Sequence, residues 1–200
     1  MLLSAHETAI RTRTGLSSSD GSITTAVLDS FINSALRRVA SEKDWYWLEA
    51  SESVTLANGT DTYTAAATSV RTIVLIDANG TALDMEPLEK VLRNVGSAAT
   101  PNMFCRFGAT LIVRPTPNTS GTLSHRYVRG EVTLASDSDT QLLPAVWDDA
   151  VTEYACYLVN LRLGRPDAAA ANLAAYTGWV QQMKARADRY ADTHGGGDPA

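Results

Sequence analysis

Asp44-Trp45-Tyr46-Trp47 is the stretch that decides the fold, because a helical sequence pattern ends there and a strand pattern begins. Before it, apolar residues within 27–39 recur at intervals of three and four, which predicts a helix over about 24–43. After it, apolar and polar residues alternate over 52–56, the period of a strand. The four residues therefore mark the join between a helical layer and a β layer.

The two tryptophans of this join allow two interpretations. Large rings at a helix-to-strand corner fill the seam between packed layers, and this packed corner is the prediction for Trp45 and Trp47. The alternative is an exposed stacking platform, which would make the protein a carbohydrate- or peptide-binding β module. Insensitivity of indole fluorescence to soluble quenchers distinguishes the packed corner from the platform.

Beyond the join, residues 51–143 read as a series of short strands. Asn58-Gly59 and Asn79-Gly80 predict two hairpins, the second with a type I′ turn, which needs positive φ at both central residues. Gly108-Ala109 predicts a third reversal between two further strands, and 121–128 alternates like a half-buried strand. Six or seven short strands predict a small antiparallel sandwich or barrel.

The carboxyl-terminal part returns to helical patterns. Leu143-Pro144 begins one predicted helix and Gly164 ends it, the usual placement of proline and glycine. A second helix carries a narrow seam at intervals of four and three residues, which either another helix of this chain or a neighbouring subunit must cover. We predict that this seam forms a subunit interface, and its members are Tyr176, Val180, Met183, Ala187 and Tyr190.

Together these patterns predict an α+β fold, with a helical core built from both ends of the chain and an inserted small antiparallel β sandwich or barrel. The expected parts are core helices over 1–50, the β subdomain over 51–143, further core helices over 144–193 and a flexible tail over 194–200. Two terminal helical segments that enclose an insert must meet in space, which is a scaffold plan.

Composition limits the classes of function. Hydrophobic residues make up 44% of the 200-residue chain, enough for a real core, and no apolar run is long enough to span a bilayer, so we expect neither secretion nor membrane insertion. The net charge of -5 includes no basic segment, which excludes tight DNA binding. Cys105 and Cys156 have no paired spacing, so we expect both to be buried, reduced thiols.

The sequence predicts no catalytic, cofactor-binding or metal-binding residues. Asp137 and Asp139 form the one carboxylate pair worth testing, because Asp-X-Asp can hold Mg²⁺ in phosphate-transferring hydrolases. That alternative is weak, since no buried strand leads into the pair and no lysine lies near it. His125 is interpreted as a core or interface residue rather than a general base.

The linear pattern resembles the head-to-tail adaptor (connector) proteins of tailed bacteriophages. The resemblance covers nearly the whole chain and is one of order, without a single diagnostic motif. It departs after Tyr63, where the family often has Leu-Pro and this chain has Thr64-Ala65. The matching pieces include Phe31-Ile32-Asn33-Ser34-Ala35, Trp45-Tyr46-Trp47-Leu48-Glu49, 54–63, Leu111-Ile112-Val113-Arg114-Pro115-Thr116-Pro117 and Gln141-Leu142-Leu143-Pro144.

The resemblance implies a structural virion protein in the neck, between the capsid portal and the tail, made in the host cytoplasm. It implies a homo-oligomeric ring, typically a dodecamer, that docks on the portal and on a tail, stopper or tail-completion protein. DNA would pass through the ring without sequence-specific binding, and no catalysis is implied. We expect residues 167–200 to contact the portal or adjacent subunits.

Overall fold

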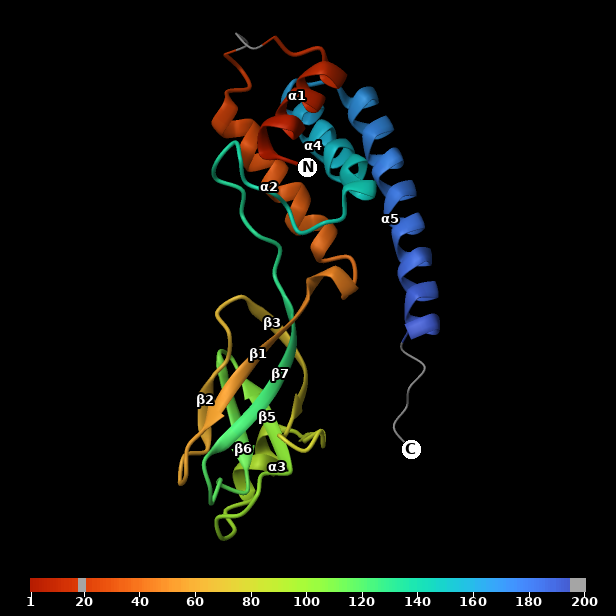
Figure 1. The fold of residues 1–200 in the computed structure, drawn as a ribbon. Helices are drawn as coiled ribbons and strands as arrows, with labels where there is room; N and C mark the ends of the chain where they lie inside the picture. Colours follow the sequence, from red (N-terminus) through yellow and green to blue (C-terminus); the bar gives the residue numbers. More distant parts are fainter. Residues whose placement is uncertain (18–20, 195–200) are drawn as a thin grey trace. The chain divides into compact units, whose positions relative to one another are not determined.

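The computed structural model describes residues 1–17 and 21–194, with side chains as far as Arg189. The chain divides into two units, a helical unit of Met1–Leu48 with Glu131–Ala200 and a β unit of Glu49–Gly130. The α+β fold class is therefore confirmed. Figure 1 labels the helices and strands along the chain.

In residues 1–17 and 21–194, the helical unit contains four helices and two short 3₁₀ turns, Tyr46–Leu48 at its border with the β unit and Ala145–Trp147 directly before α4. Its central helix is α4, which packs against each of the other three. The Thr24 hydroxyl accepts a hydrogen bond from Val27 N at 3.4 Å, as expected of an N-cap. The helices are α1 (Leu3–Thr14), α2 (Thr25–Ala40), α4 (Asp148–Arg162) and α5 (Pro166–His194).

The β unit is a sandwich of two sheets, with strand orders β1-β7-β3 and β2-β6-β5-β4. All strand pairs are antiparallel except β4–β5, which is parallel. One short helix, α3 (Leu88–Arg93), lies between β4 and β5. The strands are β1 (Glu49–Leu56), β2 (Thr62–Thr64), β3 (Ser69–Ile76), β4 (Asp84–Met85), β5 (Met103–Phe107), β6 (Thr110–Arg114) and β7 (Gly121–Arg129).

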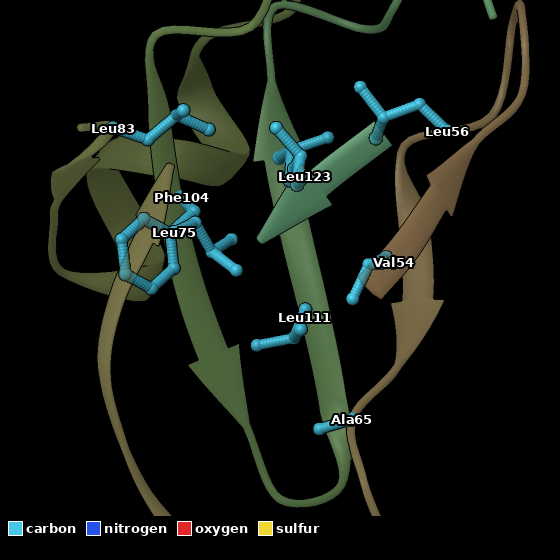
Figure 2. Packing of buried hydrophobic residues seen from close by; sticks show 9 residues of the cluster. Val54, Leu56, Ala65, Leu75, Leu83, Phe104, Leu111 and Leu123 are labelled. Carbon is cyan, nitrogen blue, oxygen red and sulfur yellow. The ribbon is translucent and has the colours of Figure 1, made fainter. Parts of the chain in front are cut away.

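An apolar cluster between the two sheets holds the sandwich together. Leucines and valines of both sheets point inward around Phe104, and Figure 2 shows them meeting in one layer. Burying each large side chain contributes roughly 1.5 to 3 kcal/mol. Arg106 adds a polar link from β5 to β3, because its guanidinium donates to the hydroxyl and the carbonyl of Ser69, each at 2.7 Å.

Two of the three predicted reversals need correction. The chain turns at Asn58-Gly59, but β1 and β2 do not pair, because β1 adds to β7 and β2 to β6. At Asn79-Gly80 the chain does reverse, with Asp77 N donating to Thr81 O at 2.8 Å. That turn is not type I′, since Gly80 has positive φ and Asn79 does not. The Gly108-Ala109 reversal between β5 and β6 is confirmed.

The β unit also ends earlier than the expected insert of 51–143. Residues 131–143 belong to the helical unit, because they form a loop that is bonded to its helices. Leu134 in this loop is buried and Asn33 of α2 binds its backbone. The helical core therefore includes residues 131–143 in addition to the expected 1–50 and 144–193.

Candidate assembly surfaces

The predicted seam of α5 lies against the chain's own helices. The side chains of Tyr176, Val180, Met183 and Ala187 are 1–7% exposed in the single chain. The fifth member, Tyr190, lies in α5, but its side chain is outside the described residues. The sequence left open whether another helix of this chain or a neighbouring subunit covers the seam. For these four residues, the structure shows helices of the same chain. A role of the seam between subunits stays a prediction.

Glu42, just beyond α2, fixes the position of α5. Its carboxylate accepts a hydrogen bond from Lys184 Nζ at 2.8 Å and a weaker one from the Tyr176 hydroxyl at 3.4 Å. Arg38 approaches the same carboxylate to 2.8 Å. The hydrogen bond from Lys184 and the charges of both cations lower the pKa of Glu42, while burial raises the pKa of Tyr176. Lys43 and Asp188 form a second ion pair nearby.

A groove opens beside this ion-pair cluster, and we call it the tyrosine groove. It has a volume of about 390 Å³; Tyr154 and Tyr157 of α4 lie in it, and α5 contributes Leu173 and Thr177. Both tyrosines are half-buried, with ring centroids 5.4 Å apart. Aromatic side chains that are half-covered by their own chain are typical of protein–protein contact sites.

Trp45 and Trp47 stack on each other, with ring centroids 4.6 Å apart and planes 14° apart. Trp45 is fully buried, and its indole N–H donates to Val39 O at 2.7 Å, while Trp47 is half-buried. Tyr46 meets Trp47 edge-on at 5.0 Å. A ring that is buried and hydrogen-bonded in this way has no face left for a sugar or a base, which favours the packed corner over the platform.

Asn33 is a structural residue that sequence reasoning missed. Its side-chain amide donates to Leu134 O and accepts from Leu134 N, both at 2.8 Å, as a neighbouring strand would. The amide is 7% exposed and lies on the buried face of α2, beside Ile32 and Leu36. A polar residue inside an apolar stripe was the available signal, since buried polar groups require partners.

A second buried polar cluster joins α1, the 131–143 loop and α4. His6 Nε2 lies 2.7 Å from Gln141 Oε1, and Gln141 Nε2 donates to Asp148 Oδ1 at 2.5 Å. Burial lowers the pKa of His6, so the imidazole is neutral and donates from Nε2. His6 Nδ1 faces the Thr152 hydroxyl at 3.4 Å. The cluster fixes the loop and leaves no open position for a substrate.

Glu7 and Asp29 form a carboxyl pair between α1 and α2. Within the described residues, Glu7 Oε1 and Asp29 Oδ1 are buried without a hydrogen-bond donor. Burial, the hydrogen bond to Asp29 and the charges of Asp29 and Asp137 raise the pKa of Glu7 to about 7, against the opposing charge of Arg11. A proton shared between the two carboxyl groups satisfies both oxygens.

The residues proposed for Mg²⁺ chemistry have other roles. Asp139 Oδ2 accepts hydrogen bonds from the backbone N–H groups of Ala135 and Ser136 at 2.7 and 2.9 Å, which lower the pKa of Asp139 and close a surface turn. Across residues 1–17 and 21–194, no group of three or more His, Cys, Asp and Glu side chains is placed to hold a metal ion. Nothing in this geometry favours the hydrolase alternative.

His125 lies in the β unit within a relay that crosses three strands. Its Nδ1 is 2.7 Å from Glu52 Oε1 and its Nε2 is 3.0 Å from the Thr72 hydroxyl. This order resembles a nucleophile–base–acid triad, but Thr72 is 3% exposed and His125 is fully buried. A nucleophile needs access to its substrate, so the relay acts as a link between β1, β7 and β3. Cys105 and Cys156 are buried free thiols, as expected.

In the part of the chain that the structure describes, no helix has the length and apolarity to cross a membrane. Residues 3–198 match the family model described as SU10 adaptor protein. A search of curated proteins found no significant match.

Proposed function

Since the chain belongs to the SU10 adaptor protein family, we propose that it is the head-to-tail adaptor ring of a tailed bacteriophage. An adaptor of this family is a structural protein of the virion, and the earlier resemblance to phage head-to-tail adaptors is thereby confirmed. In the proposal, copies of the chain form a ring, twelve in number as is typical of such adaptors, that docks on the portal. The ring then joins the capsid to a tail or stopper protein.

One observation carries the proposal: the family match runs over residues 3–198, so both the helical unit and the β unit take part in it. The chemistry of the described residues agrees, because their buried polar groups join parts of the fold and none is open to a substrate. The net charge of -5 suits a channel wall, since DNA phosphates slide past acidic surfaces without being neutralised.

Electron microscopy of the particle that contains the chain tests this proposal directly. We expect a closed ring of this protein between the portal and the tail, which would place the chain in the virion neck. Particles in which the protein lies elsewhere, or in which it makes no ring, would refute the proposed function. A monomer in dilute solution would not, because a portal can serve as the template on which the ring closes.

The proposed contact with the portal or with adjacent subunits lies in residues 167–200. Removing residues 191–200 should weaken docking on the purified portal, as measured by co-sedimentation. The control replaces the same ten residues by a glycine–serine sequence of equal length, which separates the chemistry of the segment from its length. Undiminished docking of the truncated chain would show that the portal contact lies outside this segment.

A further inference from the structure

The sequence Ala-Asn-Gly-Thr occurs twice in the β unit, at 57–60 and at 78–81. Asparagine is thermally labile, and a glycine after it speeds the loss of its side-chain amide, because glycine has no Cβ to hinder its own nitrogen. All residues of both copies are exposed, and both glycines have positive φ. The two copies therefore share their sequence and exposure, and a difference in their chemistry must come from the contacts around them.

The loss of the amide needs only water as a co-reactant. The glycine nitrogen gives up its proton and attacks Cγ of the asparagine, and the bond from Cγ to the amide nitrogen breaks, so that ammonia leaves with that proton. The product is a five-membered succinimide ring. Water then opens the ring at one of its two carbonyls and leaves either aspartate or isoaspartate, in which the main chain runs through Cγ. One water enters and one ammonia leaves, and nothing is oxidised or reduced.

Contacts with other segments hold the copy at 57–60. Gly59 N donates to Pro117 O at 2.8 Å, so the nitrogen that would attack is bonded to a distant part of the chain. The Tyr63 hydroxyl accepts a hydrogen bond from the backbone N–H of the first residue of the copy at 3.2 Å and donates to the carbonyl of the last at 2.5 Å. The Tyr63 ring itself packs against the apolar cluster. Several long-range contacts must therefore break before this glycine nitrogen can react.

The copy at 78–81 is held by Asp77, the residue directly before it. Asp77 O accepts a hydrogen bond from Gly80 N at 3.1 Å. Asp77 Oδ1 accepts from Asn79 N and from Thr81 N, both at 2.8 Å. Because these partners lie within one short turn, the turn can open locally without breaking contacts to other segments. Local opening frees the nitrogen of Gly80 to reach the side chain of Asn79.

We propose that Asn79 is a modification site, at which the chain converts asparagine to aspartate and isoaspartate without an enzyme. Asn58, in the same tetrapeptide, is protected by its contacts with Tyr63 and Pro117. The structure thus separates two positions that the sequence makes equivalent. This inference is independent of the proposed function, and its failure would leave that function untouched.

Conversion at Asn79 has a structural consequence for the β unit. Isoaspartate adds one carbon to the main chain of the turn, so the N–H groups that follow it can no longer all reach Asp77. The turn leads into Leu83, which is buried in the apolar cluster and whose N–H donates to Leu75 O at 2.8 Å. Conversion should therefore loosen the edge of β3 and lower the stability of the β unit.

Incubation of the full chain in warm, mildly alkaline heavy-oxygen water tests the proposal. Trypsin places Asn58 and Asn79 in separate peptides, 44–71 and 72–90, and each peptide contains a single asparagine. Digestion in ordinary water at mildly acidic pH leaves the heavy oxygen as a mark of conversion during the incubation. By mass spectrometry of the two peptides, we expect conversion to be several times faster at Asn79 than at Asn58.

The same chain in a denaturing concentration of urea is the control, because the two identical tetrapeptides then have no folded contacts. We expect the two rates to become similar there. Equal rates in the folded chain, or faster conversion at Asn58, overturn the proposal. A difference of the same size in urea overturns it as well, since such a difference does not come from the fold.

Two variants test the assigned contacts one at a time. Tyr63→Phe removes the hydroxyl but keeps the ring against the apolar cluster, so it should raise the rate at Asn58 and leave Asn79 unchanged in the same sample. Asp77→Ala removes the carboxylate of the other turn and should raise the rate at Asn79 alone. A Tyr63→Phe chain that keeps the circular dichroism and both rates of the parent chain contradicts the protection assigned to this hydroxyl.

Ageing of a variant that cannot react tests the structural consequence. Asn79→Ser has no amide to lose at this position, and residue 79 is exposed, so the fresh variant should fold like the parent chain. After the same incubation, we expect the sheet signal of the parent chain to be lost at lower urea and that of Asn79→Ser to be unchanged. An equal shift in both aged chains would place the damage elsewhere and overturn this consequence.

Discussion

The helical unit and the β unit differ in their charge and in how far apart along the chain the segments lie that their polar links join. The helical unit contains 15 acidic and 10 basic residues and so carries the whole net charge of -5, whereas the β unit contains seven of each. Buried polar links such as Asn33 and Gln141 join distant segments of the helical unit, while nine apolar residues form the centre of the β unit. The β unit also has polar links, from Arg106 to Ser69 and through His125, but these join strands of one continuous segment. The links of the helical unit instead hold together segments from both ends of the chain.

The largest expected effect concerns the apolar cluster of the β unit. Phe104→Ala should destabilise the β unit by about 3 to 5 kcal/mol, because Phe104 is fully buried among leucines of both sheets. Phe107→Ala, in the same strand but 65% exposed, is the matched control and should change stability by under about 1 kcal/mol. Urea unfolding followed by circular dichroism measures both values.

The same variant tests whether the two units unfold separately. All four tryptophans of the chain lie in the helical unit, so indole fluorescence follows that unit alone. We expect Phe104→Ala to leave the fluorescence transition unchanged while the sheet signal is lost at lower urea. A fluorescence transition that shifts by the same amount would mean that the two units unfold as one.

The next effect concerns the directional links of the helical unit. Asn33→Ala should cost about 2 to 4 kcal/mol, because it leaves the N–H and the carbonyl of buried Leu134 without partners. The control Ser34→Ala removes a hydroxyl that bonds only within α2, where it donates to Ser30 O and accepts from the exposed Arg37 side chain, and it should have little effect. Tryptophan fluorescence in urea reports the loss. Equal midpoints for the two variants would show that the link from Asn33 is dispensable.

These residues also show what the sequence could and could not predict. Helix α2 and the strand β7 followed from periodicity, which is a local property of the chain. The partners of β1 and β2 did not, because a turn such as Asn58-Gly59 shows that the chain reverses and not which strands then pair. The burial of the α5 seam followed from its spacing, but the helix that covers it did not.

The polar links were the hardest features to predict. Asn33 and Leu134 are 101 residues apart, and His6 and Gln141 are 135 apart, so no local pattern connects them. A polar side chain in an apolar stripe indicates that a partner exists and leaves its identity open. The tyrosine groove is equally non-local, because its lining comes from three parts of the chain. These are α4, α5, and the end of α2 with the turn after it, where Arg38 and Glu42 lie.

A smaller effect should appear in the pH dependence of the helical unit. In the folded chain the pKa of Glu7 is about 7, above its ordinary value near 4.5, so the folded state holds a proton that the unfolded state releases. The stability from that proton is complete below pH 4.5 and is lost as pH rises through 7. We expect the parent chain to lose about 1 to 3 kcal/mol of unfolding free energy from this group as pH rises through the window, and Glu7→Gln to show no such loss.

Fluorescence-detected unfolding at several pH values measures this difference. Glu7→Gln should match the parent chain near pH 4.5 and exceed it in stability near pH 8. Glu89→Gln, in an exposed ion pair of the β unit, is the control and should leave the pH profile of the helical unit unchanged. The comparison with Glu7→Gln is needed because buried His6, whose pKa is lowered, adds stability as pH rises toward 6.5. A parent chain whose stability does not fall relative to Glu7→Gln between pH 5 and 8 would contradict the shared proton.

The smallest effect concerns Glu42, whose contribution to stability is lost as pH falls, whereas that of Glu7 is lost as pH rises. The hydrogen bond from Lys184 and the charge of Arg38 lower the pKa of Glu42, so its contribution is present above the ordinary pKa near 4.5 and is lost as pH falls through the lowered value. Because Lys184 and Arg38 are partly exposed, Glu42→Gln should cost only about 1 kcal/mol at pH 7, and less in high salt. Measured at pH 7 and below pH 3 by tryptophan fluorescence, this cost should vanish in acid. A cost that persists there would mean that Glu42 holds α5 by packing rather than by charge, and the helical unit would then resemble the β unit at this point.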